Sequence, residues 1–339
     1  MDSSDPSVMS ADRACVDPKT VLVAIPTLNE EKHIRATLMA VAGDPSAPVK
    51  VVVADGGSTD KTRDIVTEMA AGHPNIHLID NPDRLQSVAI NRVVQHAAEP
   101  HHTILVRVDA HSVYPAGYVM DVAQSLVNRG AQGLATVMDS IGDSCFQRGA
   151  AWAMDSKLGS GGSGHRGGTR SGWVDHGHHA GFDLEMFRNV GGYDTSFVAN
   201  EDAELDHRIG DAGGRIWLDA TIRLGYIMRP SLRSLAVQYW GYGTGRAQNL
   251  LKHRMRPRLR QLIPPVMFLC NLGALGLALF VPGALLVPLA YLALLGAVTL
   301  KTLLEKRSLC ALWVGPALFA MHMVWSAGFL VHIIKGARR

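Results

Sequence analysis

Cysteine is scarce and shows no paired spacing. The 339 residues hold four, scattered at Cys15, Cys145, Cys270 and Cys310. This distribution predicts neither a disulfide framework nor a zinc site, and it favours a reducing compartment. The N-terminus is acidic and polar and lacks the apolar run of a secretory signal peptide. We therefore expect residues 1–19 to be disordered and the domain that follows to stay in the cytosol.

Acidic residues are missing from a later segment. Between Arg229 and Arg260 there are eight Lys or Arg residues and no Asp or Glu. A basic segment just before an apolar block predicts interfacial helices over 229–261 that lie against anionic lipid headgroups. A solvated basic face is the alternative. Nucleic acid is not an expected partner, because no reader motif accompanies the charge.

Charge of either sign nearly vanishes from Leu262 to Ile334, apart from a cluster at 301–307. Three apolar stretches occupy this block: Leu262–Val281, Ala284–Leu300 and Leu309–Ile334. The first and third are long enough to span a hydrocarbon core of about 30 Å, and the second is at the lower limit. Buried core helices are the alternative. We expect transmembrane or re-entrant helices over 262–335.

The positive-inside rule predicts the topology of this block. Two crossings would return Lys301, Lys306 and Arg307 to the cytosol, whereas a third would carry the basic C-terminus, including Arg338 and Arg339, outside. Gly315-Pro316 interrupts the third stretch. We therefore expect that stretch to be re-entrant or interfacial and the C-terminus to be cytosolic.

Residues 20–228 have the mixed composition of a globular domain. Short β-branched runs at 20–25, 49–54, 76–80 and 103–109 read as buried strands. Helical spacing lies between them, with helices expected to open at Asn29, near Asp60 and near residue 85. The alternation predicts an α/β domain with a doubly wound, mostly parallel sheet, whose ligands bind beyond the carboxyl ends of the strands.

A glycine-rich segment follows at 159–172, with seven glycines in fourteen residues. It is too long for a simple connector. Polar and His-containing segments flank it, which favours an active-site loop over a flexible linker.

Four phrases occur in order: AIPTLNEE, VVVADGGSTDKT, RVDAH at 107–111 and NEDAE at 200–204. Together they resemble the family 2 glycosyltransferases, which have a GT-A fold (that of nucleotide-diphospho-sugar transferases). LGSGGSGHRGGTRSGWVDHGHHAGF and YWGYGTGR narrow the resemblance to the ExoA-type group of bacterial exopolysaccharide (succinoglycan) enzymes. The resemblance covers about residues 20–250.

The resemblance implies a nucleoside pocket. Its residues would be Pro26, Thr27, Asn29, Glu30 and Asp55, with Arg84 joining from the side. From chemistry alone, Asp55 at a strand end can accept a hydrogen bond from a base imide N–H. Glu30 and Asp109 suit ribose hydroxyls or a metal site. Asp60 fits better as a helix cap than as a ligand contact.

Carboxylates that face a diphosphate need a divalent cation between them, and oxygen ligands suit Mg²⁺ or Mn²⁺. The family motif is usually Asp-x-Asp, but here it reads Asp109-Ala110-His111. A neutral imidazole at His111 favours Mn²⁺. Alternatively, His111 hydrogen-bonds a phosphate and the metal is held elsewhere. The cluster 175–179, with three histidines, could complete the site.

Glu201-Asp202 match the family's Glu-Asp pair, in which the Asp is the general base. Direct displacement at the anomeric carbon needs one carboxylate to deprotonate the acceptor hydroxyl, and this inverts the anomeric configuration in one step. The alternative, a solvated helix start with acids that favour the dipole, applies better to Glu204.

Several residues are candidates for the acceptor or its diphosphate: His178, His179, Tyr239, Trp240 and Arg246. Aromatic rings stack on sugars, although interface anchoring competes for Tyr239 and Trp240. The segment lacks the Gln/Arg-x-x-Arg-Trp pattern of related processive enzymes, so long-chain processivity is not expected.

These observations predict a membrane-anchored, inverting, metal-dependent hexosyltransferase at the bacterial inner membrane, with its catalytic domain in the cytoplasm. The donor would be a UDP-sugar, with UDP-glucose and a β-1,3 linkage implied by resemblance. The acceptor would be a polyprenyl-diphosphate-linked saccharide. One rival is transfer to a bare polyprenyl phosphate, as in dolichol-phosphate mannosyltransferase-like enzymes. A membrane-anchored oxidoreductase is remote because no G-x-G-x-x-G turn follows the first strand. A catalytically silent subunit is disfavoured by Asp55, Asp109 and Asp202 together.

Overall fold

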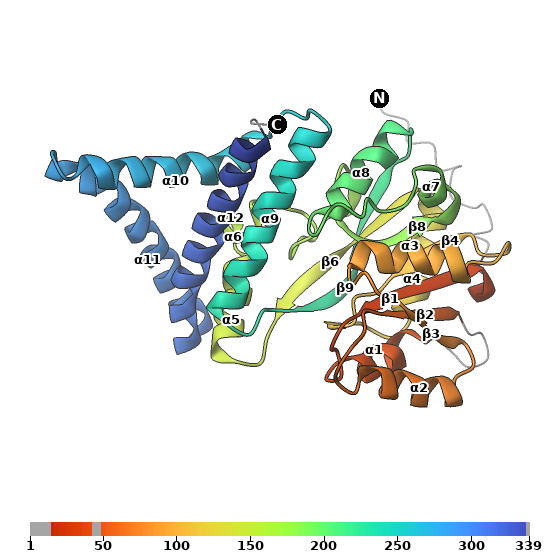
Figure 1. Ribbon diagram of the computed structural model, residues 1–339. Helices are drawn as coiled ribbons and strands as arrows, with labels where there is room; N and C mark the ends of the chain where they lie inside the picture. Colours follow the sequence, from red (N-terminus) through yellow and green to blue (C-terminus); the bar gives the residue numbers. More distant parts are fainter. Residues whose placement is uncertain (1–14, 43–48, 337–339) are drawn as a thin grey trace, which may run out of the picture.

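The computed structural model describes residues 15–42 and 49–336. It consists of a nine-stranded sheet with helices on its faces, followed by a group of C-terminal helices (Figure 1). The sheet order is β3-β2-β1-β4-β8-β6-β9-β5, with β7 paired to β9. Residues 1–14 of the predicted disordered N-terminus lie outside the described chain, as do Arg338 and Arg339. Val16 is already buried, and its amide donates to Gln124 at 3.0 Å.

Four parallel strands form the first half of the sheet, as predicted. They are β1 (Val21–Thr27), β2 (Lys50–Asp55), β3 (Ile76–Asp80) and β4 (Ile104–Arg107). Helices α1 (Ile34–Val41), α2 (Thr62–Gly72) and α3 (Gln86–Ala97) connect them. The register pairs Thr27 with Asp55 and Asp55 with Asp80, so the polar strand ends meet at one edge.

The first helix begins later than predicted. Asn29 does not open it, because its backbone is left-handed (φ 57°) and its side-chain oxygen accepts from the Thr59 amide at 2.8 Å. The Glu30 amide donates to Thr62 at 2.7 Å. Asp60 accepts from the amide of Thr62, the first residue of α2, at 3.0 Å, although the N-cap position itself is occupied by Lys61. These bonds join the two loops at the strand ends into one surface.

The second half of the sheet is mixed rather than parallel. Its strands are β5 (Ser112–Val113), β6 (Gly133–Ile141), β7 (Gly172–Val174), β8 (His178–Asp183) and β9 (Ile216–Ile227). β8 is antiparallel to β4 and β6, whereas β6 and β9 are parallel. The accompanying helices are α4 (Tyr118–Arg129), α5 (Cys145–Asp155), α6 (Lys157–Ser160), α7 (Leu184–Asn189) and α8 (Glu201–Asp211).

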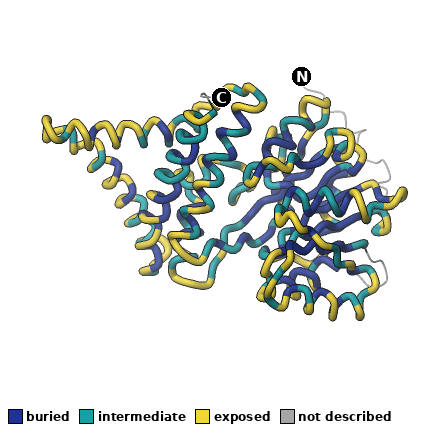
Figure 2. The backbone as a smooth tube through the Cα atoms, viewed as in Figure 1, coloured by how far each residue is buried: buried dark blue, intermediate teal, exposed yellow. Residues whose placement is uncertain are grey.

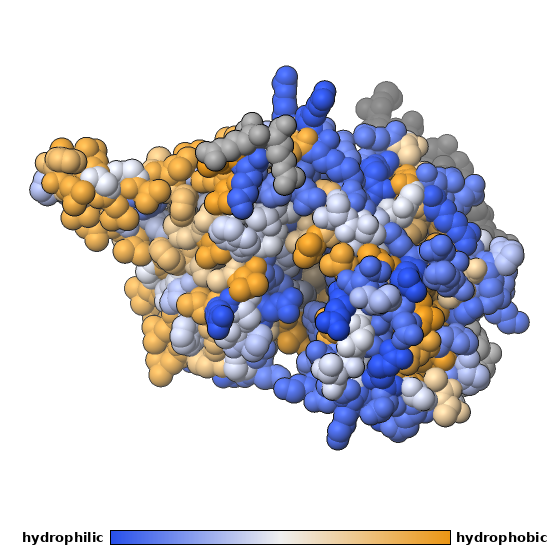
Figure 3. Space-filling model, in the orientation of Figure 1, coloured by the Kyte–Doolittle hydropathy of each residue, from blue (hydrophilic) through white to orange (hydrophobic). Residues whose placement is uncertain are grey.

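The C-terminal part is helical and divides into two regions. Its elements are α9 (Leu232–Lys252), α10 (Leu259–Leu277), the short turn η2 (Pro282–Leu285), α11 (Leu286–Lys306), the short turn η3 (Leu309–Trp313) and α12 (Val314–Gly336). α12 packs along α9, whereas α10 and α11 project away as a V (Figure 1). Exposed residues run along this V (Figure 2), and they are largely apolar (Figure 3).

Two segments are long and apolar enough to cross a membrane, Pro282–Lys306 and Leu309–Gly336. These two candidates contain the second and third of the expected stretches. The expectation for the first stretch was wrong, because α10 does not qualify within the described chain. Gly315-Pro316 also does not interrupt the third stretch. Pro316 lies in the first turn of α12, where its missing N–H removes no helical hydrogen bond.

α9 is not a helix that lies freely on a surface. Its buried positions include Leu235, Tyr239 and Leu250, and glycines allow a close approach of its neighbours. A Cβ at Gly243 would lie 2.1 Å from the Trp325 carbonyl oxygen of α12, and one at Gly245 would lie 2.2 Å from the Ala199 carbonyl oxygen. The glycines of YWGYGTGR therefore let α9 pack tightly between α12 and the catalytic domain.

Cys145 and Cys310 form a disulfide that joins α5 to η3. The prediction of no disulfide was wrong, because these residues are 165 positions apart and only tertiary packing brings them together. A Cβ at Gly149 would lie 2.4 Å from the Cys310 carbonyl oxygen, so this glycine permits the close packing of η3 on α5. Cysteine spacing consequently gives no argument for a reducing compartment.

Candidate active site

Asp55 organises the turn beyond β2. Its buried carboxylate accepts from the amides of Gly57 and Ser58, both at 3.0 Å, and from Arg63 at 2.9 Å. Burial alone would raise the pKa of Asp55, but hydrogen bonds from Ser58 and Arg63 outweigh it and lower the pKa. The carboxylate is therefore ionised, and its hydrogen bonds fix the conformation of the turn at the strand edge.

The other predicted nucleoside residues surround this turn. Pro26 and Thr27 end β1, and the Thr27 hydroxyl lies 3.5 Å from Asp55. Arg84 is exposed and has a left-handed backbone (φ 59°) beside the turn. Glu30 binds the ring of His111 at 2.8 Å. This hydrogen bond outweighs burial and raises the pKa of His111.

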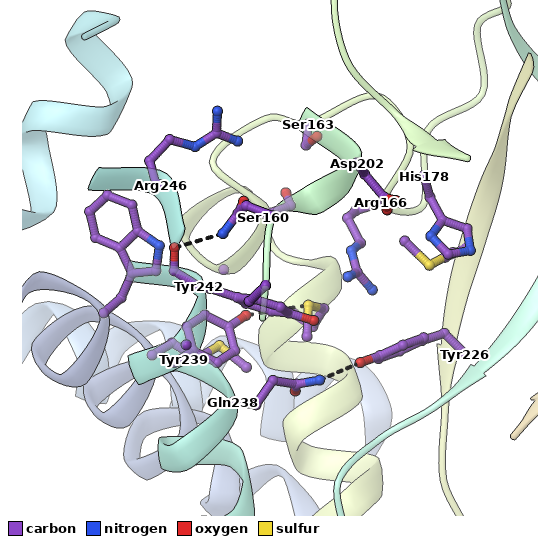
Figure 4. Close-up of a pocket in the computed structure, with 18 of the residues that line it drawn as sticks. Ser160, Ser163, Arg166, His178, Asp202, Tyr226, Gln238, Tyr239, Tyr242 and Arg246 are labelled. Carbon is purple, nitrogen blue, oxygen red and sulfur yellow. Dashed lines mark hydrogen bonds between the residues drawn. The ribbon is translucent and has the colours of Figure 1, made fainter. Parts of the chain in front are cut away.

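A cavity of about 960 Å³ opens next to this edge, between the sheet and the C-terminal helices (Figure 4). Most of the predicted catalytic, metal and acceptor residues line it: Asp109, His111, His178, Glu201, Asp202, Tyr239 and Arg246. His179 and Trp240 are not among its lining residues. The predicted active-site loop at 159–172 does contribute, through residues that include His165 and Arg166.

Arg107 connects Asp109 to the candidate catalytic pair Glu201-Asp202. It is buried on β4, and its guanidinium contacts Asp109 at 3.3 Å, Glu201 at 3.7 Å and Asp202. Tyr193 also contacts Asp202, at 3.2 Å. Sequence reasoning missed Arg107, although a charged residue within the apolar run TILVRVD was a usable signal, since a buried charge needs partners.

The two members of the Glu-Asp pair have opposite electrostatics. Burial alone would raise the pKa of Asp202, but Arg107 and His179 outweigh it and hold the pKa well below the usual range. Burial and the charge on Asp202 instead raise the pKa of Glu201 to about 7. Asp202 is thus ionised near neutral pH, whereas Glu201 is close to half protonated.

The histidine cluster divides between two roles. His178 faces the cavity and lies 3.8 Å from Asp109. His176 and His179 instead bind Asp206 of α8, the former at 2.7 Å. His179 is fully buried, 3.4 Å behind Asp202. It therefore holds Asp202 from behind and does not line the cavity.

The imidazoles differ in charge as well as position. Burial opposes charge on His179, but Asp206 and Asp202 outweigh it and raise its pKa to about 10. Burial lowers the pKa of His178 to about 4. A neutral His178 therefore faces Asp109, and a cationic His179 backs Asp202.

A divalent cation fits this site only if phosphate oxygens of a bound substrate supply the rest of its ligands. Within residues 15–42 and 49–336, no group of three or more His, Cys, Asp or Glu side chains is arranged to hold a metal. Asp109 receives Gln86 at 3.0 Å and Arg107 at 3.3 Å on one carboxylate oxygen, and its other oxygen faces His178. One carboxylate with nearby imidazoles matches cations that take one or two protein ligands together with substrate phosphates.

The polar strand ends, the mixed sheet and the partly buried acidic pair are those of a nucleotide-diphospho-sugar transferase of the GT-A fold. The chain belongs to glycosyl transferase family 2, whose family model matches residues 22–191. It is 42% identical over 325 residues to the succinoglycan biosynthesis protein ExoA of Rhizobium meliloti (strain 1021), covering 94% of this chain and 96% of that protein. The family and fold predicted from sequence are confirmed, and the oxidoreductase alternative is excluded.

Two more distant proteins share nearly the full length. One is the dolichyl N-acetyl-alpha-D-glucosaminyl phosphate 3-beta-D-2,3-diacetamido-2,3-dideoxy-beta-D-glucuronosyltransferase of Methanococcus voltae, 24% identical over 93% of this chain and 98% of that protein. The other is the mannosyltransferase of Pyrobaculum calidifontis, solved with GDP-Man and Mn²⁺. It matches with a TM-score of 0.57 and 22% identity, over 94% of this chain and 88% of that one. At that identity the structural match supports the fold alone.

Proposed function

We propose that this glycosyltransferase transfers a hexose, glucose from UDP-glucose, to a polyprenyl-diphosphate-linked saccharide in exopolysaccharide biosynthesis. One observation carries the proposal: a single cavity joins Asp109 and the acidic pair at 201–202 to a wall supplied by α12. Two relatives point the same way, since one is named for succinoglycan biosynthesis and the other for a dolichyl-linked sugar phosphate.

The donor nucleotide would lie on the strand edge beside the cavity. The residues that we propose to contact it are Pro26, Thr27, Asn29, Glu30, Asp55, Arg84 and Asp109. Asp55 accepts the base imide N–H in place of the Ser58 hydroxyl, which can rotate away. The sugar then projects toward the cavity, where Asp109 marks the position of its diphosphate.

Asp202 would act as the general base, with Arg107 and His179 holding it ionised and in place. It takes the proton of the acceptor hydroxyl while that oxygen bonds to the anomeric carbon. The bond from the anomeric carbon to the β-phosphate oxygen breaks, and UDP leaves with the electron pair. A Mn²⁺ or Mg²⁺ ion held by Asp109 and His111 would neutralise charge on the leaving diphosphate. The single displacement inverts the anomeric carbon, which resemblance assigns to a β-1,3 product.

Metal dependence should be measurable, with Mn²⁺ preferred over Mg²⁺ because of His111. Treatment with EDTA should abolish transfer, and His111→Asp should shift the preference toward Mg²⁺, which favours oxygen ligands. Full activity after EDTA treatment would show that transfer does not require a metal ion. Unchanged metal dependence in His111→Ala would leave His111 as a phosphate contact and place the metal elsewhere.

The direct test uses bacterial inner membranes that contain the protein, with the catalytic domain expected on the cytoplasmic face. The membranes are incubated with a panel of radiolabelled sugar nucleotides, and the lipids are then extracted. Label from UDP-glucose should enter a polyprenyl-diphosphate-linked saccharide. Label on bare polyprenyl phosphate would instead favour the polyprenyl-phosphate glycosyltransferase alternative. Label in neither lipid would contradict both.

A further inference from the structure

Several arginines of the cavity form no ion pair with any carboxylate of the described residues. Five arginines line it beyond Arg107: Arg166, Arg229, Arg233, Arg246 and Arg260. In the described part of the chain none of these five forms an ion pair, although Arg107 binds three acidic residues in the same cavity. We refer to these five residues as the arginine wall. Asp155 and Asp206 act on Arg166 and Arg246 only from beyond ion-pair distance. The guanidinium groups of the wall are therefore available to bind an anion.

Arg166 is held in place, but one nitrogen of its guanidinium lacks a hydrogen-bond partner. Its guanidinium lies 4.6 Å from the ring centre of Tyr226, and its Nη1 atom is shielded from solvent without any hydrogen bond. The backbone around it is anchored to β6, because the Met138 amide donates to His165 at 2.9 Å and the Gly167 amide donates to Met138 at 3.1 Å. A buried cationic donor without an acceptor is costly, and a bound anion would remove that cost.

Arg246 enters the same cavity from α9 (Figure 4). Burial and the neighbouring charges of Arg260 and Arg258 lower the pKa of Arg246 to about 10. Arg258 is already paired with Asp175 at the surface, whereas Arg246 and Arg260 have no such partner among the residues described. The region around α9 therefore concentrates charge toward the cavity instead of presenting it only to lipid headgroups.

An apolar wall adjoins these arginines. Met321 and Trp325 of α12 line the cavity, together with Leu158 and Val237. α12 belongs to a segment that is long and apolar enough to cross a membrane. Charged and apolar surfaces side by side match a ligand that joins an anionic group to a hydrocarbon chain. A free nucleotide has no hydrocarbon chain that could pack against the apolar wall.

We propose that the arginine wall binds the phosphate or diphosphate group of a lipid-linked acceptor, with Arg166 and Arg246 as its main contacts. The proposal rests on the proposed function and adds an assignment for the glycine-rich segment, which presents Arg166 to the acceptor anion. A guanidinium suits this role because its fork of donors matches phosphate oxygens. The acceptor hydroxyl then lies toward Asp202, in the same cavity.

Binding without turnover tests the assignment. Farnesyl diphosphate serves as a short lipid diphosphate, and UDP reports on the donor site; both are titrated into the purified full chain. Arg166→Gln and Arg246→Gln should each weaken farnesyl diphosphate binding about ten-fold or more, as expected for a lost hydrogen bond to a charged group. UDP binding should stay within about two-fold. Arg166→Lys should restore part of the affinity, because it keeps the charge but not the fork.

Arg170→Gln is the matched control, since Arg170 lies in the same glycine-rich segment but is exposed and does not line the cavity. It should change neither affinity, and equal melting temperatures would show that all variants fold. If UDP affinity falls instead, the arginines belong to the donor site and the proposal is wrong. If neither affinity changes, the wall binds no diphosphate. Arginine-dependent farnesyl diphosphate binding without sugar transfer to lipid would uphold this site while contradicting the proposed function.

Discussion

Asp202 and Asp55 are both ionised carboxylates, but their surroundings assign them different tasks. Asp202 lies in the cavity against Arg107, whereas Asp55 lies at the strand edge and holds a turn. We expect Asp202→Asn to lower the rate by about 10²–10⁴-fold, the usual contribution of a general base, with UDP affinity changed by no more than a few-fold. Asp55→Asn should weaken UDP binding first. Loss of UDP binding in step with activity in Asp202→Asn would make Asp202 a donor or metal ligand.

Glu201 should make stability depend on pH. Its pKa is raised to about 7 by burial and by Asp202, so the folded protein binds a proton that the unfolded chain releases at lower pH. The stability that this proton contributes to the folded protein is therefore fully present at acidic pH, below the pKa of the unfolded chain, and is lost as the pH rises through about 7. Glu201→Gln removes this dependence. The difference in melting temperature, variant minus wild type, should therefore be more positive at pH 8 than at pH 5. An equal difference in melting temperature at both values would contradict the raised pKa.

Sequence reasoning predicted the functional residues that end strands or open helices, but it did not predict their partners. Asp55 and Asp109 follow apolar runs, so the strand-edge rule was enough to place them. Arg107 and His179 support Asp202 from other elements, and only the fold brings these residues together. The position of Arg107 was therefore missed, and His179, which was expected at the acceptor, is buried behind Asp202 and does not line the cavity.

Among the elements, α9 should depend on its glycines to different degrees. A Cβ at Gly243 would lie 2.1 Å from a backbone oxygen of α12, which cannot move without shifting that helix. Gly243→Ala should therefore lower both the melting temperature and the activity, with a stability loss of about 1–3 kcal/mol or more, as for other overpacked sites.

Gly241→Ala provides the comparison, because a Cβ there would meet Ala199 at an ordinary 3.7 Å. In a helix interior Ala is favoured over Gly by about 0.8–1.0 kcal/mol. This variant should therefore melt at the same temperature or higher, with activity retained. Equal destabilisation by both substitutions would mean that helix packing on α12 is not the role of Gly243.

Apolar periodicity located most helices and strands, and long-range packing accounts for the errors. α1 starts five residues after Asn29, because Asn29 hydrogen-bonds to the loop beyond β2 and has a non-helical backbone. The disulfide could not be predicted from the sequence, because Cys145 and Cys310 approach each other only when η3 packs on α5. The mixed second half of the sheet was equally inaccessible, since strand direction there depends on pairing between distant segments.

At the scale of the whole molecule, α12 packs along α9, which lies between it and the catalytic domain (Figure 1). Its beginning is tied to α5 through Cys310 in η3, and its middle packs on α9 at Gly243 and Gly328. α9 carries polar residues such as Gln238 and Lys252, the latter bound to acids of the catalytic domain. The ends of α10 and α11 that meet at η2 project away from this body (Figure 1). Sequence composition identified the apolar stretches but not which of them packs on the enzyme.

This arrangement predicts that the turn at Arg307 and the C-terminus lie on the same side of the membrane as the catalytic domain. The beginning of α12 is tied to that domain through Cys310, and its C-terminal end packs on α9, whose Lys252 binds acids of the domain. The basic residues Lys301, Lys306 and Arg307 favour the cytosol. Alkaline phosphatase fused after residue 307 or after residue 339 should be inactive, and a fluorescent protein at either position should fluoresce. High phosphatase activity at 307 alone would show that α11 and α12 both cross the membrane. High activity at 339 would show that α12 alone carries the C-terminus outside. Either result would refute the packing of α12 along a cytosolic domain.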